Sequence, residues 1–471
     1  MVRYNSIRYA PFGTKPSTTS WASKQRVGFL VLAFFIAIAV SIASYAESTL
    51  PVVQNDFPTE PFSPSITTTV TGTGRPTPTA DRVLKPTRWS FDSQRDSNDY
   101  GLSASQCDLA FQPLFEEISR AASFARNNGG VSPTELNISW TKKGAVHALI
   151  QDRQLYILST TELESGFLLP RAIAILQSIY RAILTSPNPV PNIEFSFSVS
   201  DYADPNHVNK TIWALTRLAS EESTWLMSDF AYFSWPMNGL IGSYATVRSR
   251  ISEREPAWKD KIDKAVWRGS VKPNKARQDL INAAEGKDWS DVRGIEWSSA
   301  KNLTKASRKY AVSVVDHCAY KYLIGTEGRS YSGRLKYLQN CHSTLLMPPP
   351  TWIEPHHSLL VSSGREQNYV PLNQNYSDLD EKMKDLLATP DKARSIADNA
   401  VKTFKDGVLT PAAQTCYWRR MFREWRDISF EPDADAWKRG TPFETWIITF
   451  VENVEVPAGK PENLARCNVR R

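Results

Sequence analysis

The sequence predicts an α/β protein of two lobes, preceded by a single membrane-spanning segment and an extended stem. Three observations support this prediction. The chain has 471 residues, more than one ordinary domain needs. Beyond residue 110, stretches with strand-like alternation are followed repeatedly by stretches with helical spacing. Two N-terminal segments, 27–46 and 47–88, differ sharply from the rest in composition. Alternating strands and helices are typical of parallel sheets covered by helices.

The overall composition indicates a folded protein that does not bind nucleic acid. Hydrophobic residues make up 41% of the chain and charged residues 22%, which is typical of a globular protein. The net charge of +7 is modest for this length, and the basic residues are dispersed. No basic stretch resembles a nucleic-acid-binding surface.

The N-terminal apolar run predicts a signal anchor. Residues 27–46 contain almost only apolar and small side chains and approach the roughly 20 residues that span a bilayer as a helix. The 26 residues before the run are basic, with no acidic residue. We therefore expect a cytosolic tail (1–26), an anchor (27–46) and a lumenal remainder in the Golgi or endoplasmic reticulum, the type II orientation. The alternative is a cleaved signal peptide ending at Ser44-Tyr45-Ala46, which also directs the chain to the secretory pathway.

The next segment and scattered motifs agree with a lumenal location. Residues 47–88 are rich in Pro, Thr and Ser and predict a stem that does not fold. The five cysteines form no CxxC motif, and some of them would pair in an oxidising compartment. Acceptor sequences for N-glycosylation begin at Asn137, Asn209, Asn302 and Asn375.

We divide the remainder into an acceptor-side lobe (89–247), a donor-side lobe (248–430) and a C-terminal extension (431–471). In the first lobe, helices are expected at 111–124 and 171–184, and strands within 138–158 and at 193–199. In the second lobe, strands are expected at 264–267, 320–324, 344–347 and 369–372, and helices at 275–284, 333–340, 378–387 and 391–405.

Three sets of residues have the chemistry of a site. Asp201 follows the alternating strand 193–199, at the end of a strand where open α/β sheets bind ligands. The turn Arg268-Gly269-Ser270 and the loop that ends in Ser332-Gly333-Arg334 each lie between a strand and a helix. Arginine, glycine and a hydroxyl at such a turn suit a phosphate group, and Ser332 could cap the helix. Each motif alone could equally be an ordinary turn.

Taken in order, these motifs resemble one enzyme family. The chain contains the following pieces in sequence: Trp267-Arg268-Gly269-Ser270, Asp316-His317-Cys318, Tyr320-Lys321-Tyr322-Leu323, Ser332-Gly333-Arg334, Tyr369-Val370-Pro371-Leu372, Tyr376-Ser377-Asp378-Leu379 and Cys416-Tyr417-Trp418. Their order and spacing resemble glycosyltransferase family 90, which includes capsule-associated enzymes and Rumi-like protein O-glucosyltransferases. The resemblance covers roughly residues 201–430.

The resemblance implies a GT-B fold of two Rossmann-like lobes facing a cleft. It also implies inverting, metal-independent transfer of glucose or xylose from a UDP-sugar to a glycan or glycoprotein, without a cofactor. Asp201 matches the catalytic aspartate, and Ser200 stands where the animal O-glucosyltransferases have Arg. The donor-binding positions are Arg268, Gly269, Ser270, Ser332, Gly333 and Arg334, and further candidates are Tyr202, His317 and Glu354.

The same resemblance implies two disulfides and leaves one cysteine over. The implied pairs are Cys318 with Cys341, which are 341 − 318 = 23 residues apart, and Cys107 with Cys416, so that Cys467 is unpaired.

Other functions agree less well with these residues. The pairs Asp378/Asp380 and Asp433/Asp435 could hold a cation in another class of transferase, but we interpret them as a helix terminus and a solvated loop. His342, His356 and His357 do not have the spacing of a usual zinc site. A glycoside hydrolase would need a second carboxylate. A carbohydrate-binding pseudoenzyme on the same fold is the main alternative.

Overall fold

The computed structural model describes residues 89–164, 166–202, 210–235, 241–299 and 302–451. The predicted tail, anchor and stem, together with Asn209 and Cys467, lie outside these ranges. Within them, no helix combines the length and the apolar character needed to cross a membrane. The described residues belong to one compact unit, which begins at residue 85.

The first sheet is mixed and has the order β15-β2-β1-β3-β4-β5. Its strands are β1 (Ala145–Gln151), β2 (Gln154–Thr161), β3 (Ile193–Ser198), β4 (Trp213–Ala214), β5 (Trp225–Leu226) and β15 (Thr441–Pro442). Strand β1 pairs antiparallel with both β2 and β3, whereas β3, β4 and β5 are parallel. The expectation of parallel pairing is therefore wrong for β1–β3. For β1 and β2 the cause is a tight hairpin in which Asp152 and Arg153 both adopt positive φ, the conformation that joins antiparallel strands.

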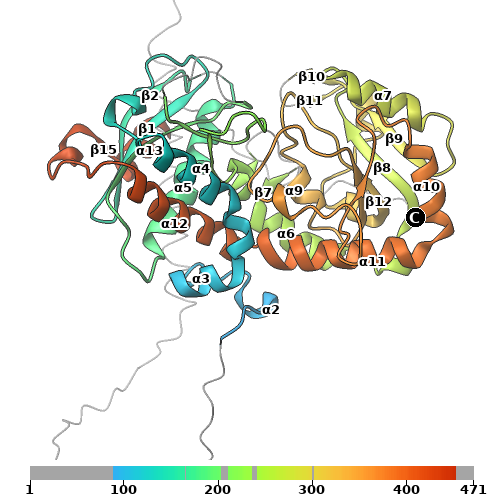
Figure 1. The fold of residues 1–471 in the computed structure, drawn as a ribbon. Coiled ribbons are helices and arrows are strands. Elements are labelled where there is room, and N and C mark those ends of the chain that lie inside the picture. Colours follow the sequence, from blue (N-terminus) through green and yellow to red (C-terminus); the bar gives the residue numbers. More distant parts are fainter. Residues whose placement is uncertain (1–88, 165, 203–209, 236–240, 300–301, 452–471) are drawn as a thin grey trace, which may run out of the picture. The chain divides into compact units, whose positions relative to one another are not determined.

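The second sheet is parallel throughout, as predicted, in the order β14-β13-β12-β8-β9. Its strands are β8 (Ile262–Gly269), β9 (Ser290–Gly294), β12 (Tyr320–Ile324), β13 (Thr344–Met347) and β14 (Val370–Pro371). Helices α7 (Lys275–Ala284), α10 (Leu379–Ala388) and α11 (Pro390–Ala400) pack beside these strands (Figure 1).

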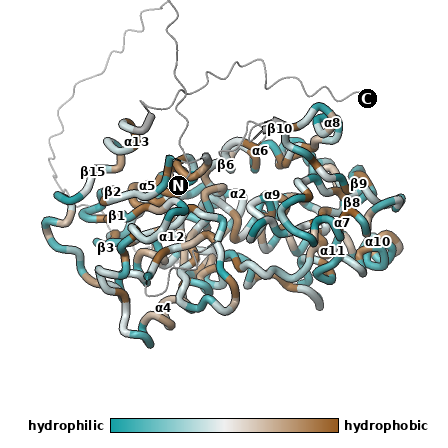
Figure 2. Tube along the Cα trace, turned by 90° about the horizontal axis from the view of Figure 1, so that it is seen from above, coloured by the Kyte–Doolittle hydropathy of each residue, from teal (hydrophilic) through white to brown (hydrophobic). Residues whose placement is uncertain are grey.

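Alternation along the strands separates two apolar cores. In β8, Val266 belongs to a core that also contains residues of the first sheet, whereas Ala265 and Trp267 face a second core. The second core takes Leu379 and Met383 from α10, and Figure 2 shows hydrophilic residues along the same helix. The central strands β12 and β13 are therefore buried on both faces, as parallel strands usually are, whereas the edge strand β9 is partly exposed.

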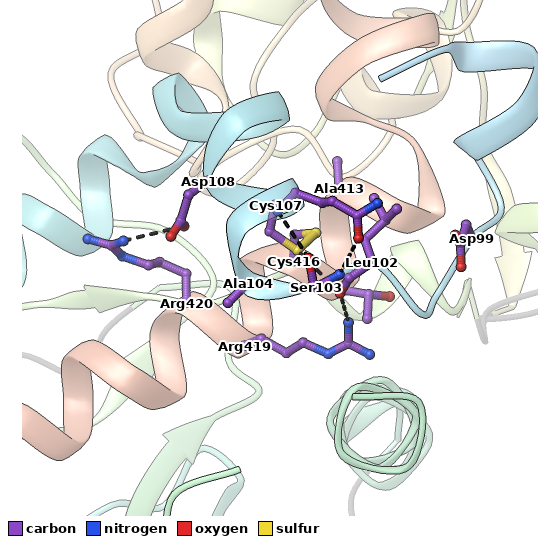
Figure 3. Close-up of a disulfide and its surroundings, with 12 residues drawn as sticks. Asp99, Leu102, Ser103, Ala104, Cys107, Asp108, Ala413, Cys416, Arg419 and Arg420 are labelled. Carbon is purple, nitrogen blue, oxygen red and sulfur yellow. Dashed lines mark hydrogen bonds and ion pairs between the residues drawn. A yellow bond between two sulfur atoms is a disulfide. The ribbon is translucent and has the colours of Figure 1, made fainter. Parts of the chain in front are cut away.

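Helix α12 (Pro411–Ile428) is the longest described helix and was not predicted from the sequence. It packs against α3 (Ala104–Phe111), α4 (Glu116–Asn127) and α5 (Leu168–Leu184), so the chain returns to the first sheet after residue 410. The predicted disulfide Cys107–Cys416 joins α3 to α12 (Figure 3). Beside it, Arg419 donates a hydrogen bond to the carbonyl of Leu102. The second predicted disulfide, Cys318–Cys341, is also present.

The remaining elements complete the described fold. The α-helices are α2 (Ser93–Asp96), α6 (Tyr244–Arg254), α8 (Lys305–Arg308), α9 (Leu335–Leu338) and α13 (Phe443–Val451), and the small strands are β6 (Ser234–Trp235), β7 (Gly242–Ser243), β10 (Trp297–Ser299) and β11 (Asn302–Leu303). The 3₁₀ segments are 112–115, 133–136, 230–232, 258–260, 316–319, 357–359 and 436–439, and 401–408 is a π-helix. Helix α9 is shorter than the predicted 333–340, and Ser332 does not cap it, since Arg334 occupies the N-cap position without a side-chain bond.

Two predicted glycosylation sites are accessible. Asn137 and Asn375 are exposed, as the modification requires, and Asn302 begins β11.

Candidate functional site

A cavity of about 370 Å³ lies where loops following β3, β8 and β12 meet. This volume is in the range of small-molecule sites. The cavity lies at the carboxyl ends of parallel strands, where α/β proteins bind ligands. Eight of the residues named from the sequence line it: Asp201, Arg268, Gly269, Ser270, His317, Ser332, Gly333 and Arg334. The fold therefore gathers side chains that are as far as 133 positions apart (334 − 201).

Tyr202 and Glu354 lie elsewhere. The Tyr202 ring is half-exposed, next to Trp352 and the ammonium group of Lys143. Glu354 is fully buried, and its carboxylate lies 3.1 Å from the ammonium of Lys336. Neither residue belongs to the cavity lining.

The two site glycines allow close packing of the cavity wall. A Cβ atom on Gly333 would lie 2.7 Å from ring atoms of Trp235, and one on Gly269 would lie 2.6 Å from the ring of Trp267. Both distances are too short for non-bonded carbons. Glycine is therefore required at these positions by its small size.

Arg268 is engaged entirely by other protein groups. Its Nη2 bonds both carboxylate oxygens of Asp291 at 2.8 and 2.9 Å, and its Nε donates to the carbonyl of Tyr310 at 2.6 Å. Its Nη1 donates to the carbonyls of Trp267 and Asp291. These contacts use all five N–H groups of the guanidinium. In this arrangement Arg268 orders the cavity wall, and its predicted contact with a donor phosphate would require some of these bonds to open.

Arg334 and Arg277 form a buried cationic pair. Arg334 donates to the carbonyl of Arg268, and Arg277 donates to the carbonyls of Glu327 and Ser270, each at 2.8 Å. No carboxylate of the described residues forms an ion pair with either side chain. Burial, with Arg277 nearby, lowers the pKa of Arg334 to about 9, and burial also lowers the pKa of Arg277. Two buried cations with unused N–H groups have the chemistry to bind an anion such as a pyrophosphate.

Arg277 was not predicted as a site residue, although the sequence contains a signal for it. It lies in the first turn of α7, directly after the Arg268-Gly269-Ser270 turn, and the N-cap Asn274 accepts a hydrogen bond from its backbone N–H. A helix N-terminus adds partial positive charge at the same place. The arginine at this position could have been included on that basis.

Asp201 provides the carboxylate of the cavity. Its side chain is 35% exposed, and its Oδ1 lies 2.8 Å from Nη1 of Arg171 in the first turn of α5. Ser330, on the loop that leads to Arg334, donates a hydrogen bond to the backbone carbonyl of Asp201. The carboxylate from the first sheet and the arginine from the second are therefore held next to the same cavity by direct contacts.

His317 contributes a neutral imidazole. It is buried, its Nδ1 lies 2.7 Å from the carbonyl of Ser313, and its Nε2 has no hydrogen-bond partner in the described part of the chain. Burial, with the charge of Arg334, lowers the pKa of His317 to about 3. Because Nδ1 faces a carbonyl it carries the hydrogen, and Nε2 is free to accept a bond from a ligand.

Trp297 marks a lateral extension of the cavity. With Ser270 and Ile295, it lines both the main cavity and a neighbouring one of about 430 Å³. Its side chain is 41% exposed. The sequence offered no motif for it, since a tryptophan is more often core than rim.

The paired aspartates and histidines considered for metal binding lie outside the cavity lining. Asp380 pairs with Lys287 and Lys384, and His342 pairs with Asp398. Glu354, His356 and His357 lie close together, but Lys336 supplies a positive charge to that cluster. Metal independence stays a prediction.

Comparison with known proteins identifies the family of the chain. The chain belongs to glycosyltransferase family 90, whose sequence model, described as "Glycosyl transferase family 90", matches residues 106–434. It is similar to protein O-glucosyltransferase 1 of Rattus norvegicus, with 26% identity over 249 residues, and to that of Homo sapiens, with 24%. In both cases the match covers 50% of this chain and 62% of the relative. An O-glucosyltransferase rumi homolog of Aedes aegypti is 28% identical over 204 residues, which is 41% of this chain and 50% of the relative.

Proposed function

We propose that this chain is a UDP-sugar-dependent glycosyltransferase that transfers glucose or xylose to a hydroxyl group of a glycan or a protein. The observation that carries the proposal is the buried pair Arg277 and Arg334, which has no carboxylate partner among the described residues and lines the cavity that Asp201 also lines. Membership of family 90 supports transfer of a sugar. The names of the relatives support glucose as the first donor sugar to test.

In the proposed reaction, Asp201 accepts the proton of the acceptor hydroxyl. The acceptor oxygen attacks the anomeric carbon while the bond from that carbon to the β-phosphate oxygen of UDP breaks. Negative charge grows on the departing pyrophosphate, and Arg277 with Arg334 stabilises it without reorganisation. A single displacement inverts the anomeric centre. The two guanidinium groups take the place of a divalent cation in this scheme, which needs no cofactor.

The proposed location is the lumen of the Golgi or endoplasmic reticulum, with residues 27–46 as a type II anchor. The two disulfides agree with an oxidising compartment. The exposed Asn137 and Asn375 would be glycosylated there.

A screen of UDP-sugars with the purified full-length chain tests the proposal. UDP release is measured with UDP-glucose, UDP-xylose and UDP-galactose, with and without EDTA, alongside release of free sugar. Release of UDP in the presence of EDTA, coupled to a labelled acceptor product, is expected. Binding of sugars without UDP release would favour the pseudoenzyme, and cleavage of glycosides without a nucleotide would favour a hydrolase.

A further inference from the structure

Arg171 is the described cation that lies against the carboxylate of Asp201. Its Nη1 lies 2.8 Å from Oδ1 of Asp201 and donates to the carbonyl of Val199 at 3.0 Å. The guanidinium also lies over the ring of Phe230, with its carbon 4.7 Å from the ring centroid. Three different groups therefore fix the position of this arginine: the chain just beyond β3, an aromatic face and the carboxylate itself.

The contact restrains a side chain that would otherwise have freedom to turn. The carboxylate of Asp201 is 35% exposed, whereas the Arg171 side chain is only 11% exposed. The residue before the aspartate, Ser200, has no positive charge, and the guanidinium beside the carboxylate comes from α5. Arg171 holds Oδ1, and no side chain of the described residues bonds the other oxygen, which is available to a reacting hydroxyl. Orientation of this kind is worth a large share of a catalytic effect.

We propose that Arg171 is a positioning residue that acts through Asp201, by fixing one carboxylate oxygen so that the other accepts the proton. This inference rests on the proposed function, in which Asp201 is the general base. It assigns no contact between Arg171 and the donor.

A double-mutant cycle on the full-length chain tests the inference. Arg171→Gln removes the charge, Asp201→Asn removes the base, and the double variant combines the two. Turnover number and KM are measured with the UDP-sugar found in the donor screen, and the affinity for UDP is measured by calorimetry. Arg171→Gln should lower kcat about 10- to 100-fold while the affinity for UDP changes less than about twofold. In the Asp201→Asn background the same change should cost almost nothing further, because the group through which Arg171 acts is absent.

Two further variants keep the test decisive. Arg171→Lys retains the charge but cannot hold the carbonyl of Val199 and the carboxylate with one planar group, so it should recover only part of kcat. If Arg171→Gln does not fold, Arg171→Lys takes its place in the double-mutant cycle. Arg181→Gln is the matched control, since Arg181 lies on the same helix and over the rings of Tyr100 and Phe233 but does not line the cavity. Its kcat should stay near wild type.

Two results would overturn the inference while leaving the proposed function standing. The first is an equal loss of kcat from Arg171→Gln in both backgrounds, which would indicate a general structural effect. The second is a tenfold or greater loss of UDP affinity, which would make Arg171 a donor-binding residue, in keeping with its Nε that has no partner among the described groups. A wild-type chain that turns over no UDP-sugar would overturn the proposed function and this inference together.

Discussion

At the scale of single residues, the buried pair Arg277 and Arg334 lowers the stability of the folded protein but suits the binding of an anion. Arg277 and Arg334 repel each other in a poorly solvated place, and each is less stable as a cation there than in water. Such an arrangement persists in a folded protein when a ligand supplies the missing charge. The pair is therefore a stronger indication of an anionic ligand than either arginine would be alone.

Substituting Arg334 with methionine should therefore separate stability from binding. We expect Arg334→Met to raise the free energy of unfolding of the ligand-free protein by on the order of 1 kcal/mol, the low end for replacing buried charges by apolar groups. It should also weaken UDP binding about 10- to 150-fold, the worth of a charged hydrogen bond. Thermal unfolding with and without UDP measures both effects. A variant that is less stable without UDP and keeps its UDP-induced rise in Tm would contradict the assignment.

For the proposed base, Asp201, we expect the opposite pattern: turnover should fall while UDP binding is kept. Asp201→Asn preserves the shape of the side chain and removes the proton acceptor, so kcat should fall about 10²- to 10⁴-fold. The affinity for UDP should stay within about twofold of wild type, because the carboxylate has no phosphate contact in the proposed scheme. Calorimetry and steady-state rates are measured on the same preparation. Unchanged turnover with weakened UDP binding would reverse the proposed roles.

Two buried histidines should make the free energy of unfolding fall as the pH is lowered. Burial is the main cause that lowers the pKa of both His317 and His356 to about 3. Below about pH 6.5 the unfolded chain binds a proton at each imidazole, and the folded chain does not until about pH 3. Each histidine thus contributes stability that is full above pH 6.5 and falls by about 1.4 kcal/mol per pH unit below it. Urea unfolding at pH 7, 6 and 5 measures the slope, and His317→Gln should make it shallower.

At the scale of elements, the features that could be predicted from the sequence are those that a short local segment determines. Strand β3 leads to Asp201 and strand β8 contains Arg268 near its end, because alternation and the following turn lie in one short segment. The position of Arg171 in the cavity depends on how α5 packs, which no local pattern contains. The place of Arg277 in the first turn of α7 is a local signal that was not used. The pairing of Arg268 with Asp291 depends on β9 lying beside β8. The return of α12 to the first sheet was not predicted for the same reason.

The two disulfides should act differently, because they close loops of different length. Cys107–Cys416 spans 309 residues and Cys318–Cys341 spans 23. The chain-entropy model then gives losses of about 6 and about 3 kcal/mol when each pair is replaced by alanines. Cys318 adjoins His317, and Cys341 follows the helix after Arg334. Loss of that pair should therefore also weaken UDP binding, whereas loss of Cys107–Cys416 should not. Denaturant unfolding and calorimetry compare the two variants, and equal effects on UDP affinity would contradict this division.

At the scale of the whole molecule, the sequence predicts an N-terminal anchor and stem joined to the folded unit that contains the candidate site. The described residues form a single compact unit. Both sheets contribute to the cavity, because Asp201 follows a strand of the first sheet and Arg277 and Arg334 follow strands of the second. Loops after β3, β8 and β12 meet at the cavity. The disulfide Cys107–Cys416 links α12, which packs beside the first sheet, to α3, which precedes that sheet in the chain. The stem and anchor are predicted to set where this unit meets its acceptor.

Replacing residues 1–46 with a cleavable signal peptide tests the predicted division into an anchor and a folded lumenal unit. The apolar run 27–46 and the basic residues before it predict that the truncated protein is secreted in soluble, glycosylated form with the UDP-sugar activity of the full chain. The full-length protein should stay in the membrane fraction after an alkaline carbonate wash. Sequencing its N-terminus distinguishes an uncleaved anchor from a signal peptide removed after Ala46. If the truncated protein also stayed with membranes after the wash, residues 27–46 would not be the anchor, and the membrane contact would have to be sought in the rest of the chain.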